Sequence, residues 1–244
     1  MLGDALTPVT ENPSRAGIFL DVDGTLAPIV ERAEDARVPA ETVDALRRLA
    51  ERYACVACIS GRAASDARRL VGVDEITYAG SHGAELLEPG ADEPEVASAF
   101  AEWEPRVHEF VQSQHLGDLR VEYKGPIVAL HWRGASDEAE RRAREIACHA
   151  NGFVTHWGRK VLEIRPPVEV NKGQAVRELI RRHSLDAGLF AGDDMTDLDG
   201  FAALDGLRAV RVGVRSAEGP AEIVERADLV VDGPEGVAEV LAAL

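Results

Sequence analysis

Two carboxylates separated by one residue, Asp21 and Asp23, follow directly after an apolar run at 17–20. The run is typical of a short buried strand, and residues two apart on an extended chain point the same way. Two neighbouring acids cannot both ionise freely unless a cation lies between them. The pair therefore suits a nucleophile and a general acid/base that share a divalent metal ion. An ordinary acidic turn at a strand end is the alternative interpretation.

Three more polar motifs follow predicted strands or open predicted helices. Ser60 and Arg62 come after an apolar run, Lys172 opens a helix, and an acidic stretch occupies 193–197. In open α/β sheets, ligands bind outside the carboxyl ends of the strands. The order of carboxylate pair, hydroxyl, lysine and acidic cluster therefore indicates one site rather than four unrelated turns.

These motifs resemble those of the haloacid dehalogenase-like phosphohydrolases and, within them, those of the trehalose-6-phosphate phosphatases. The resemblance extends from about residue 17 to residue 244. Leu198 departs from the family pattern, which usually has glutamate at this position. The narrower match lies in the segments 79–85 (AGSHGAE), 122–124 (EYK), 158–166 (GRKVLEIRP) and 192–197 (GDDMTD).

The resemblance implies Mg²⁺-dependent hydrolysis of trehalose 6-phosphate to trehalose and phosphate through an aspartyl-phosphate. Asp21 would attack phosphorus, which divides one difficult displacement into two easier ones. Asp23 would protonate the leaving sugar oxygen and then deprotonate the attacking water. Ser60 and Lys172 would hold the phosphoryl oxygens as their charge changes.

The implied metal ligands are Asp21, Asp193 and the backbone carbonyl of Asp23. Hard oxygen ligands beside a phosphate are typical of Mg²⁺. Asp194 and Asp197 are expected outside this set, where they would orient ligands or waters.

A second group of side chains is expected to bind the substrate. Glu122 and Lys124 share one face of a predicted strand, and Glu163 and Arg165 share one face of another. A solvated outer face would show the same pattern, but by resemblance Glu122, Lys124 and Glu163 match sugar-binding positions of the family. The full substrate-binding set expected is Thr25, Arg62, His82, Glu122, Lys124 and Glu163.

Other functions remain open at this point. The carboxylate pair is equally compatible with a phosphatase for sucrose phosphate, a phosphoglycerate-linked sugar or another small sugar phosphate. It also fits a phosphomutase of the same fold. A sugar-phosphate binding module without catalysis is a further alternative, although the intact acidic and lysine motifs argue against it.

The chain has 244 residues, with 27 basic against 43 acidic side chains and a net charge of −16. This charge disfavours nucleic acid and anionic membranes as partners, since both need a positive field. A metal ion with Lys172 and Arg62 would make the pocket locally positive for an anionic substrate. We expect a monomer that binds a small sugar phosphate.

Strand and helix patterns alternate from residue 17 onward, which predicts an α/β fold with a Rossmann-like parallel sheet. We expect core segments at 1–85 and 169–244, with an inserted α/β cap domain at 86–168. Apolar residues between 96 and 110 recur at spacings of four and three, which predicts one amphipathic helix there.

Two features indicate a cytoplasmic location. Residues 1–16 show no signal-peptide pattern and are expected to form a loosely ordered tail. The three cysteines do not form a disulfide framework. Cys55 and Cys58 fall in a predicted strand, where an offset of three places the thiols on opposite faces.

Overall fold

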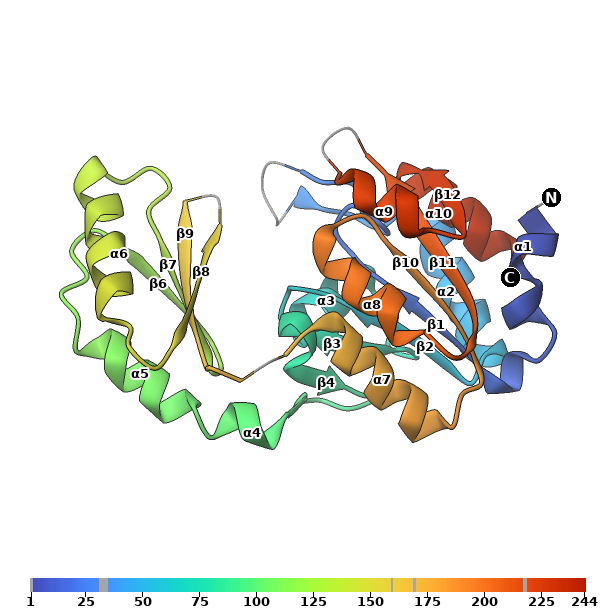
Figure 1. Ribbon diagram of the computed structural model, residues 1–244, viewed down its shortest axis with the longest axis horizontal. Helices are drawn as coiled ribbons and strands as arrows, with labels where there is room; N and C mark the ends of the chain where they lie inside the picture. Colours follow the sequence, from blue (N-terminus) through green and yellow to red (C-terminus); the bar gives the residue numbers. More distant parts are fainter. Residues whose placement is uncertain (1, 31–34, 159, 169, 217–218) are drawn as a thin grey trace. The chain divides into compact units, whose positions relative to one another are not determined.

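The computed structural model describes residues 2–30, 35–158, 160–168, 170–216 and 219–244. It divides into two compact units, drawn in Figure 1: unit 1 comprises Met1–Glu95 and Val170–Leu244, and unit 2 comprises Val96–Glu169. Residues 86–95 were assigned to the insertion from the sequence, whereas the structure groups them with unit 1. The reason is β4 (Glu85–Leu87), which pairs with β3 (Thr77–Gly80) at the edge of the unit 1 sheet.

Unit 1 is built on an eight-stranded sheet in the order β12-β11-β10-β1-β2-β3-β4-β5. The pairs from β12 to β3 are parallel, and β4 is antiparallel to β3. The remaining strands are β1 (Ala16–Leu20), β2 (Cys55–Ile59), β5 (Glu95–Val96), β10 (Ala187–Gly192), β11 (Arg208–Arg215) and β12 (Leu229–Asp232).

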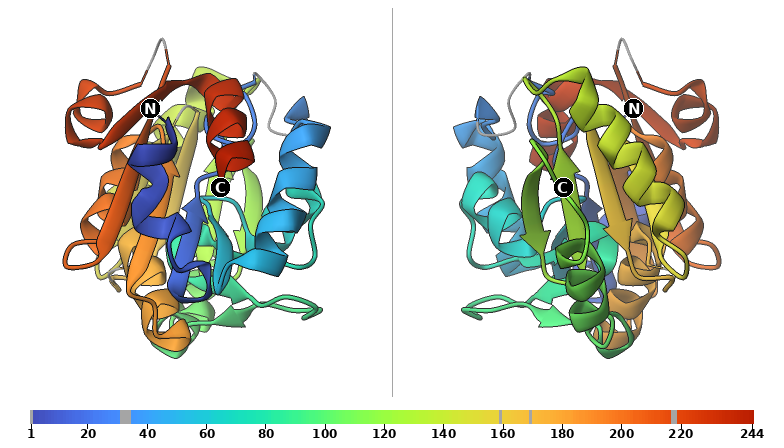
Figure 2. Two further views of the ribbon diagram at one scale, coloured as in Figure 1. Left: turned by 90° about the vertical axis from the view of Figure 1, so that its right-hand side faces the viewer. Right: turned by 90° about the vertical axis from the view of Figure 1, so that its left-hand side faces the viewer.

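Helices cover both faces of this sheet, as the end-on views in Figure 2 show. The helices α1, α2, α3 and α10 pack on one face, and α7, α8 and α9 pack on the other. The central strands β1, β2 and β10 are buried along their whole length, as expected for parallel strands covered on both sides. The predicted α/β fold with a parallel sheet is confirmed.

The helices of unit 1 have the following bounds: α1 (Leu2–Thr10), α2 (Ala40–Arg52), α3 (Ala64–Val71), α7 (Lys172–His183), α8 (Leu198–Ala203), α9 (Ala221–Arg226) and α10 (Gly233–Ala243).

The loosely ordered tail expected at 1–16 is wrong for the described residues. Residues 2–10 form α1, whose Leu6 and Val9 are fully buried against the same core as α10. Leu2, Leu6 and Val9 recur at helical spacing. The segment is short and contains Pro8, which removes one backbone donor, so the helical pattern is weak in the sequence.

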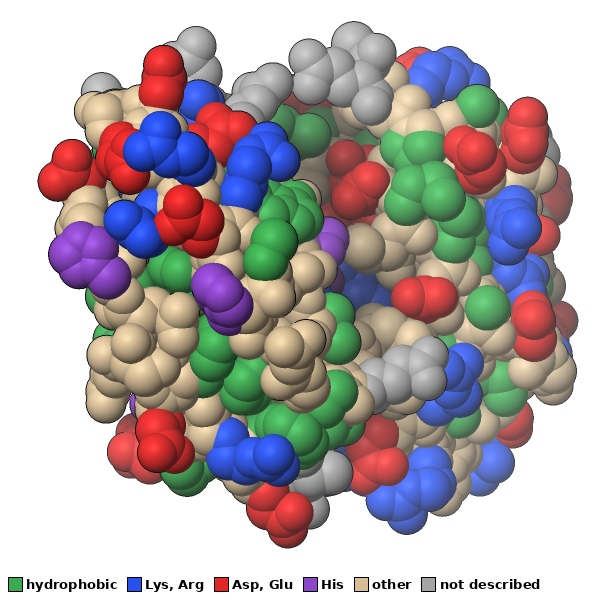
Figure 3. Space-filling view, turned by 60° about the vertical axis from the view of Figure 1, so that its left-hand side comes forward, with side chains coloured by type: hydrophobic (Ala, Val, Ile, Leu, Met, Phe, Trp, Pro, Cys, Tyr) green, Lys and Arg blue, Asp and Glu red, His purple; other side chains and the backbone are tan. Residues whose placement is uncertain are grey.

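Unit 2 is a four-stranded antiparallel sheet in the order β6-β7-β9-β8. Two helices, α5 (Glu104–Gln112) and α6 (Asp137–His149), pack on one face and enclose a separate hydrophobic core. The solvent side of α6 carries intrahelical Arg–Glu pairs. Acidic and basic side chains are interspersed over the surface in Figure 3. The strands are β6 (Arg120–Lys124), β7 (Ile127–His131), β8 (Val154–Gly158) and β9 (Val161–Arg165).

The single helix predicted over 96–110 is wrong. The structure has the end of β5, then α4 (Ser98–Ala101), then a new helix, α5, from Glu104. Pro105 lies in the first turn of α5, where the missing N–H costs nothing. In a continuous helix its ring would clash with the preceding turn. The apolar spacing therefore continues across a helix boundary.

The cysteine prediction is confirmed. The thiols of Cys55 and Cys58 belong to the two cores on opposite faces of the unit 1 sheet. Both are free and buried, and burial raises the pKa of Cys55 to about 12. In the part of the chain that the structure describes, no helix is long and apolar enough to cross a bilayer.

Candidate active site

The carboxyl ends of three neighbouring parallel strands carry predicted catalytic residues. Asp21 follows β1, Ser60 follows β2 and Asp193 follows β10. Strand β1 lies between the other two, and the Asp21 amide donates a hydrogen bond to the Ala191 carbonyl oxygen at 2.9 Å. The structure therefore places these side chains along one edge of the sheet, where ligands usually bind in this architecture.

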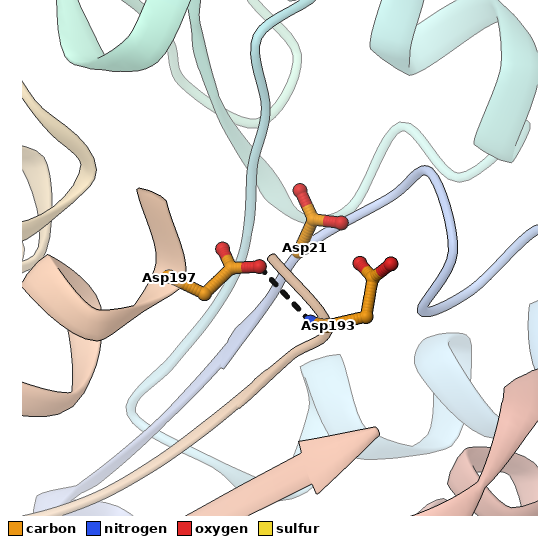
Figure 4. Close-up of side chains that lie close together, drawn as sticks. All are labelled: Asp21, Asp193 and Asp197. Carbon is orange, nitrogen blue, oxygen red and sulfur yellow. Dashed lines mark hydrogen bonds between the residues drawn. The ribbon is translucent and has the colours of Figure 1, made fainter. Parts of the chain in front are cut away.

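Three buried carboxylates meet at this edge, as Figure 4 shows. One oxygen from each of Asp21, Asp193 and Asp197 lies within 4.8 Å of the others. Asp197 lies in a 3₁₀ turn, Met195–Asp197, and its Oδ2 accepts hydrogen bonds from the amides of Asp193 and Asp194 at 3.0 Å each. Asp197 thus fixes the turn that carries Asp193.

Lys172 connects two of these carboxylates. Its Nζ lies 2.6 Å from Asp21 Oδ1 and 2.6 Å from Asp197 Oδ1. The residue begins α7, and the side chain of the N-cap Asn171 accepts a hydrogen bond from the Gln174 amide. Burial alone would lower the pKa of Lys172, but the two carboxylates outweigh it and hold the pKa above its usual value. Lys172 is therefore a fixed ammonium.

The cluster has an excess of negative charge. Burial raises the pKa of Asp21 well above its usual value, and neighbouring Asp197 and Asp193 add to this effect against Lys172. Burial and the Asp197 carboxylate raise the pKa of Asp193 to about 6. One ammonium does not balance three carboxylates, so these residues favour an additional cation.

The surroundings of Asp193 fit a close-packed ion site. Gly24 has φ +92°, and a Cβ at this position would collide with the Asp193 carboxylate. The chain after Asp23 can therefore approach Asp193 only because residue 24 is glycine. Thr25 is fully buried and donates from Oγ1 to Asp193 Oδ1 at 3.3 Å, which favours a positioning role over direct substrate contact.

The side chain of Asp23 has a different partner. Arg62 donates from Nε to Asp23 Oδ2 at 2.7 Å and from its NH2 to Oδ1 at 2.6 Å, a bidentate ion pair. The hydrogen bonds to Asp23 raise the pKa of Arg62 above its usual value. The Arg62 amide also donates to Ser60 Oγ at 3.1 Å. The Asp23 carboxylate is thus held by arginine, apart from the cluster of three acids.

A strained turn supports the Ser60–Arg62 loop. Ser81 and His82 have φ of 52° and 59°, which non-glycine residues rarely adopt. Their amides donate to the carbonyl oxygens of Arg62 at 2.7 Å and Ser60 at 2.9 Å. A Cβ at Gly61 would lie 2.9 Å from His82 Cε1, so the imidazole covers that glycine.

Glu85 holds this turn in place and was missed as a site residue. Its buried carboxylate accepts hydrogen bonds from the Ala64 amide at 2.8 Å and from Ser81 Oγ at 3.0 Å. It thereby joins the start of α3 to the strained turn. The sequence could have indicated a role for Glu85, because this residue ends the 79–85 segment that resembles the family.

Two residues of the acidic motif turn away from the cluster. Asp194 is exposed, and its side chain caps the 3₁₀ turn by accepting from the Met195 amide at 2.7 Å. Leu198 packs against the hydrophobic core beneath α7 and α8. The departure at residue 198 therefore adds to the core.

The remaining predicted site residues lie on one face of unit 2. Lys124 Nζ is 3.6 Å from Glu122 Oε2 and 3.8 Å from Glu163 Oε1. Arg165 Nε donates to Glu163 Oε2 at 2.9 Å, and His131 Nε2 lies 2.8 Å from Glu122 Oε2. The opposite face of the same sheet carries the unit 2 core. The predicted charged face is therefore a connected network.

His131 was assigned no role from the sequence. It lies beside Glu122 because Arg120 pairs with His131, and Glu122 with Ala129, in the antiparallel register of β6 and β7. That register depends on the hairpin geometry at residues 125–126.

Comparison with known families identifies a match over most of the chain. The family model described as trehalose-phosphatase matches residues 19–228. The chain is 36% identical over 215 residues to an uncharacterized glycosyl hydrolase of Mycobacterium tuberculosis, covering 82% of this chain. It is 34% identical over 240 residues to a trehalose-phosphate phosphatase of Mycobacterium marinum, covering 92% of this chain.

Solved structures share the fold. A crystal structure of a trehalose-6-phosphate phosphatase related protein matches with a TM-score of 0.68 and 29% identity, over 93% of this chain and 95% of that one. A haloacid dehalogenase-like hydrolase from Bacteroides thetaiotaomicron matches with a TM-score of 0.69 at 15% identity, over 93% of this chain and 98% of that one, and so supports the fold alone.

The curated relatives are longer than this chain. The chain spans 16% of the length of the M. tuberculosis protein and 60% of the M. marinum protein. The similarity therefore covers a part of each of these proteins.

Proposed function

Because the chain belongs to the trehalose-phosphatase family, we propose that it hydrolyses trehalose 6-phosphate to trehalose and phosphate. The observation that carries this proposal is the buried Asp21 at the end of β1, held by Lys172 beside Asp193 and Asp197. An isolated carboxylate would not be retained in such a buried position without a charged partner. This arrangement suits a carboxylate nucleophile that acts on a phosphoryl group.

In the first half of the reaction, a carboxylate oxygen of Asp21 forms a bond to phosphorus while the bond from phosphorus to the sugar oxygen breaks. Lys172 holds Asp21 Oδ1, which orients the carboxylate for attack. Asp23, once it has left Arg62 and taken up a proton from solvent, gives this proton to the departing sugar oxygen. The products of this step are the free sugar and an aspartyl-phosphate.

In the second half, water attacks the phosphorus of the aspartyl-phosphate. Asp23 takes a proton from this water, and the bond between phosphorus and Asp21 breaks. Phosphate leaves, and both carboxyl groups return to their starting states.

Arg62 links substrate binding to Asp23. Its guanidinium is paired with Asp23 in the structure. A phosphate dianion would compete for these donors, since bidentate recognition of phosphate and carboxylate is similar. We infer that substrate binding releases Asp23 for proton transfer, while Ser60 and Lys172 bind phosphoryl oxygens.

Mg²⁺ is the cation that we propose for the acidic cluster. Asp21, Asp193 and the Asp23 backbone carbonyl would hold it, and Asp197 would orient the Asp193 turn. When bound, Mg²⁺ would neutralise charge on the phosphoryl oxygens. The hard oxygen donors, the elevated pKa of Asp193 and the close approach of Gly24 support this choice.

The sugar is proposed to bind the charged face of unit 2. Carboxylates accept and ammonium groups donate, so Glu122, Lys124 and Glu163 together suit the hydroxyls of a neutral disaccharide. The spacing of 3.6 to 3.8 Å around Lys124 leaves these groups loosely paired with one another. Glu122 and Glu163 have closer partners in His131 and Arg165, so Lys124 is the group of the three that a sugar hydroxyl could engage most readily.

We also propose a cytoplasmic enzyme that acts as a monomer on a small molecule, without a nucleic acid partner. The free cysteines and the net charge of −16 support the location and the partner class. Light scattering of the purified protein at 26.3 kDa per chain tests the monomer.

A phosphate-release assay with a substrate panel tests the proposed function. The panel contains trehalose 6-phosphate, sucrose 6-phosphate, glucose 6-phosphate and p-nitrophenyl phosphate, each with Mg²⁺. We expect trehalose 6-phosphate to have the highest kcat/KM. Equal activity on glucose 6-phosphate would reduce the assignment to a general sugar phosphatase. Transfer of phosphate back to a sugar, without net release, would identify a mutase.

A further inference from the structure

A pocket of about 480 Å³ opens in unit 2 on the face of its sheet opposite to the charged network. Trp157 pairs with Leu162 across β8 and β9, and Leu162 belongs to the unit 2 core. The pocket is therefore on the α6 side of the sheet, and the described residues that line it belong to unit 2. The lining residues are Trp132, Glu140, Arg144, Trp157, Gly158 and Lys160.

Two indole rings form an aromatic wall of this pocket. Trp132 and Trp157 meet edge to face, with ring centroids 6.0 Å apart and planes at 72°. Trp132 is buried, but Trp157 remains 42% exposed. The guanidinium of Arg144 lies 5.4 Å from the Trp157 ring centroid. Part of the Trp157 ring is thus exposed at the pocket, beside Arg144.

The pocket also contains a buried donor. The Nε1 of Trp132 makes no hydrogen bond of regular geometry, although it lies close enough to Glu140 to help lower the pKa of that carboxyl. Buried polar groups in native proteins are nearly always fully hydrogen-bonded. A ligand oxygen beside Glu140 would give Trp132 a better-placed acceptor.

A carboxylate acceptor lies in the same pocket. Glu140 Oε1 is 2.8 Å from the Arg144 NH2, and Glu140 Oε2 is 3.7 Å from Lys160 Nζ. Hydrogen bonding to Arg144 lowers the pKa of Glu140, so it is ionised at neutral pH and acts as an acceptor. The pocket therefore combines an indole donor, a carboxylate acceptor and two cationic donors.

We propose that this pocket binds a neutral sugar ring. A pyranose has an apolar C–H face, which would stack on Trp157, and hydroxyls that both donate and accept. One hydroxyl would accept from Trp132 Nε1 and donate to Glu140. Glu140 is paired with both cationic groups, so the polar lining offers hydroxyls an acceptor and donors side by side. The volume and the mixed aromatic and polar lining are typical of small-molecule sites.

This site does not depend on the proposed reaction. Its described lining contains no residue of the acidic cluster and none of the charged network. An experiment can therefore reject the sugar pocket without rejecting the proposed hydrolysis, and the reverse.

The test uses the full chain and methyl α-D-glucopyranoside, which has no phosphate. The indole N–H signals of Trp103, Trp132 and Trp157 are assigned in a ¹H–¹⁵N spectrum by single Trp→Phe variants. We expect the sugar to shift the Trp132 and Trp157 signals with millimolar affinity and to leave Trp103 unmoved. Trp157→Ala and Glu140→Gln should each weaken binding tenfold or more, as read from the Trp132 signal.

Two controls separate this site from other binding. Lys124→Ala removes a group of the charged network and should leave the Trp132 shift unchanged. Sorbitol, which has the hydroxyls but no ring face, should shift neither indole. The proposal is overturned if the Trp132 signal does not move or if Trp157→Ala binds as well as the unmodified protein. Equal shifts with sorbitol or with inorganic phosphate would also overturn it.

Discussion

The acidic cluster of unit 1 and the charged face of unit 2 use similar side chains in contrasting environments. Asp21 and Lys172 are each 4% exposed, and their carboxylate and ammonium groups lie 2.6 Å apart. In unit 2, the side chains of Glu122 and Lys124 are 45% and 25% exposed, and their charged groups lie 3.6 Å apart. The first pair is buried and close, whereas the second is partly exposed and more widely spaced.

This difference makes the acidic cluster and the charged face suitable for different tasks. Burial raises the pKa of Asp21 and Asp193, and the buried carboxylates raise that of Lys172. Perturbed pKa values of this kind are concentrated at functional sites. Exposed ion pairs contribute only about 0–1 kcal/mol, so they can exchange partners at low cost. This contrast supports the proposal that the cluster performs the chemistry and the face recognises the sugar.

The largest effect is expected from removing the nucleophile. Asp21→Asn nearly preserves the shape of the side chain but replaces a carboxylate by an amide, so phosphate release should fall to background for every substrate. Circular dichroism checks that the variant is folded. Asp74→Asn changes an exposed carboxylate of unit 1 and should retain normal activity. Normal turnover by Asp21→Asn would exclude the covalent mechanism.

Lys172→Met tests whether the cluster is held by its buried cation. Without the ammonium, the Asp21 and Asp197 carboxylates lose their shared partner, so the free energy of unfolding should fall by about 3–5 kcal/mol. Urea unfolding measures this loss. Arg15→Met removes a half-exposed partner of Asp186 and should cost at most about 1 kcal/mol. If both variants lose the same free energy of unfolding, burial does not determine how much an ion pair contributes to the stability of this fold.

Glu85→Ala tests the support beneath the Ser60–Arg62 loop. It leaves the Ala64 amide and the Ser81 hydroxyl unpaired, which should lower the free energy of unfolding by about 1–3 kcal/mol. We expect kcat/KM to fall in parallel, because the strained turn no longer positions the loop. Glu85→Gln, which retains an acceptor for Ala64, should recover part of both losses. Unchanged kinetics in Glu85→Ala would show that the turn does not depend on Glu85.

The raised pKa of Asp193 predicts that the stabilisation of the fold by Mg²⁺ depends on pH. This effect is expected to be smaller than those of the three substitutions above. A carboxyl whose folded-state pKa is raised to about 6 stabilises the metal-free fold at low pH, and this stabilisation is lost as the pH rises through 6. Mg²⁺ offsets the loss by neutralising the ionised group. The Mg²⁺-induced rise in Tm should therefore be larger at pH 7.5 than at pH 5.

Asp193→Asn should remove most of this Mg²⁺ effect, and Asp194→Asn, which changes an exposed capping carboxylate, should retain it. An equal Tm rise at both pH values would contradict the assignment of Asp193 as a ligand.

The sequence predicted which residues follow the central strands, because that information is local, but it placed Asp197 outside the cluster that the structure shows. Asp21, Ser60 and Asp193 each follow a buried strand, and parallel strands bring their carboxyl ends to one edge of a sheet. The alternation of apolar and polar residues in β6 and β9 likewise predicted the charged face, since side chains alternate along any strand.

The features that were missed depend on tertiary contacts. Glu85 acts through Ala64, which is 21 positions away, and His131 meets Glu122 only through the hairpin register. The boundary between α4 and α5 is set by Pro105, which interrupts an apolar period that continues unbroken in sequence. The burial of α1 follows from a core that the local pattern does not show.

The most direct test of the division between chemistry and recognition is the ratio of two kcat/KM values in Lys124→Ala. Trehalose 6-phosphate and p-nitrophenyl phosphate are assayed side by side with Mg²⁺. We expect kcat/KM for the sugar phosphate to fall by roughly 5- to 150-fold, as for the loss of about 1–3 kcal/mol of hydrogen bonding. The value for the aryl phosphate, which has no sugar hydroxyls, should remain unchanged. An equal fall for both substrates would contradict the account, because Lys124 would then serve the fold or the chemistry rather than recognition of the sugar.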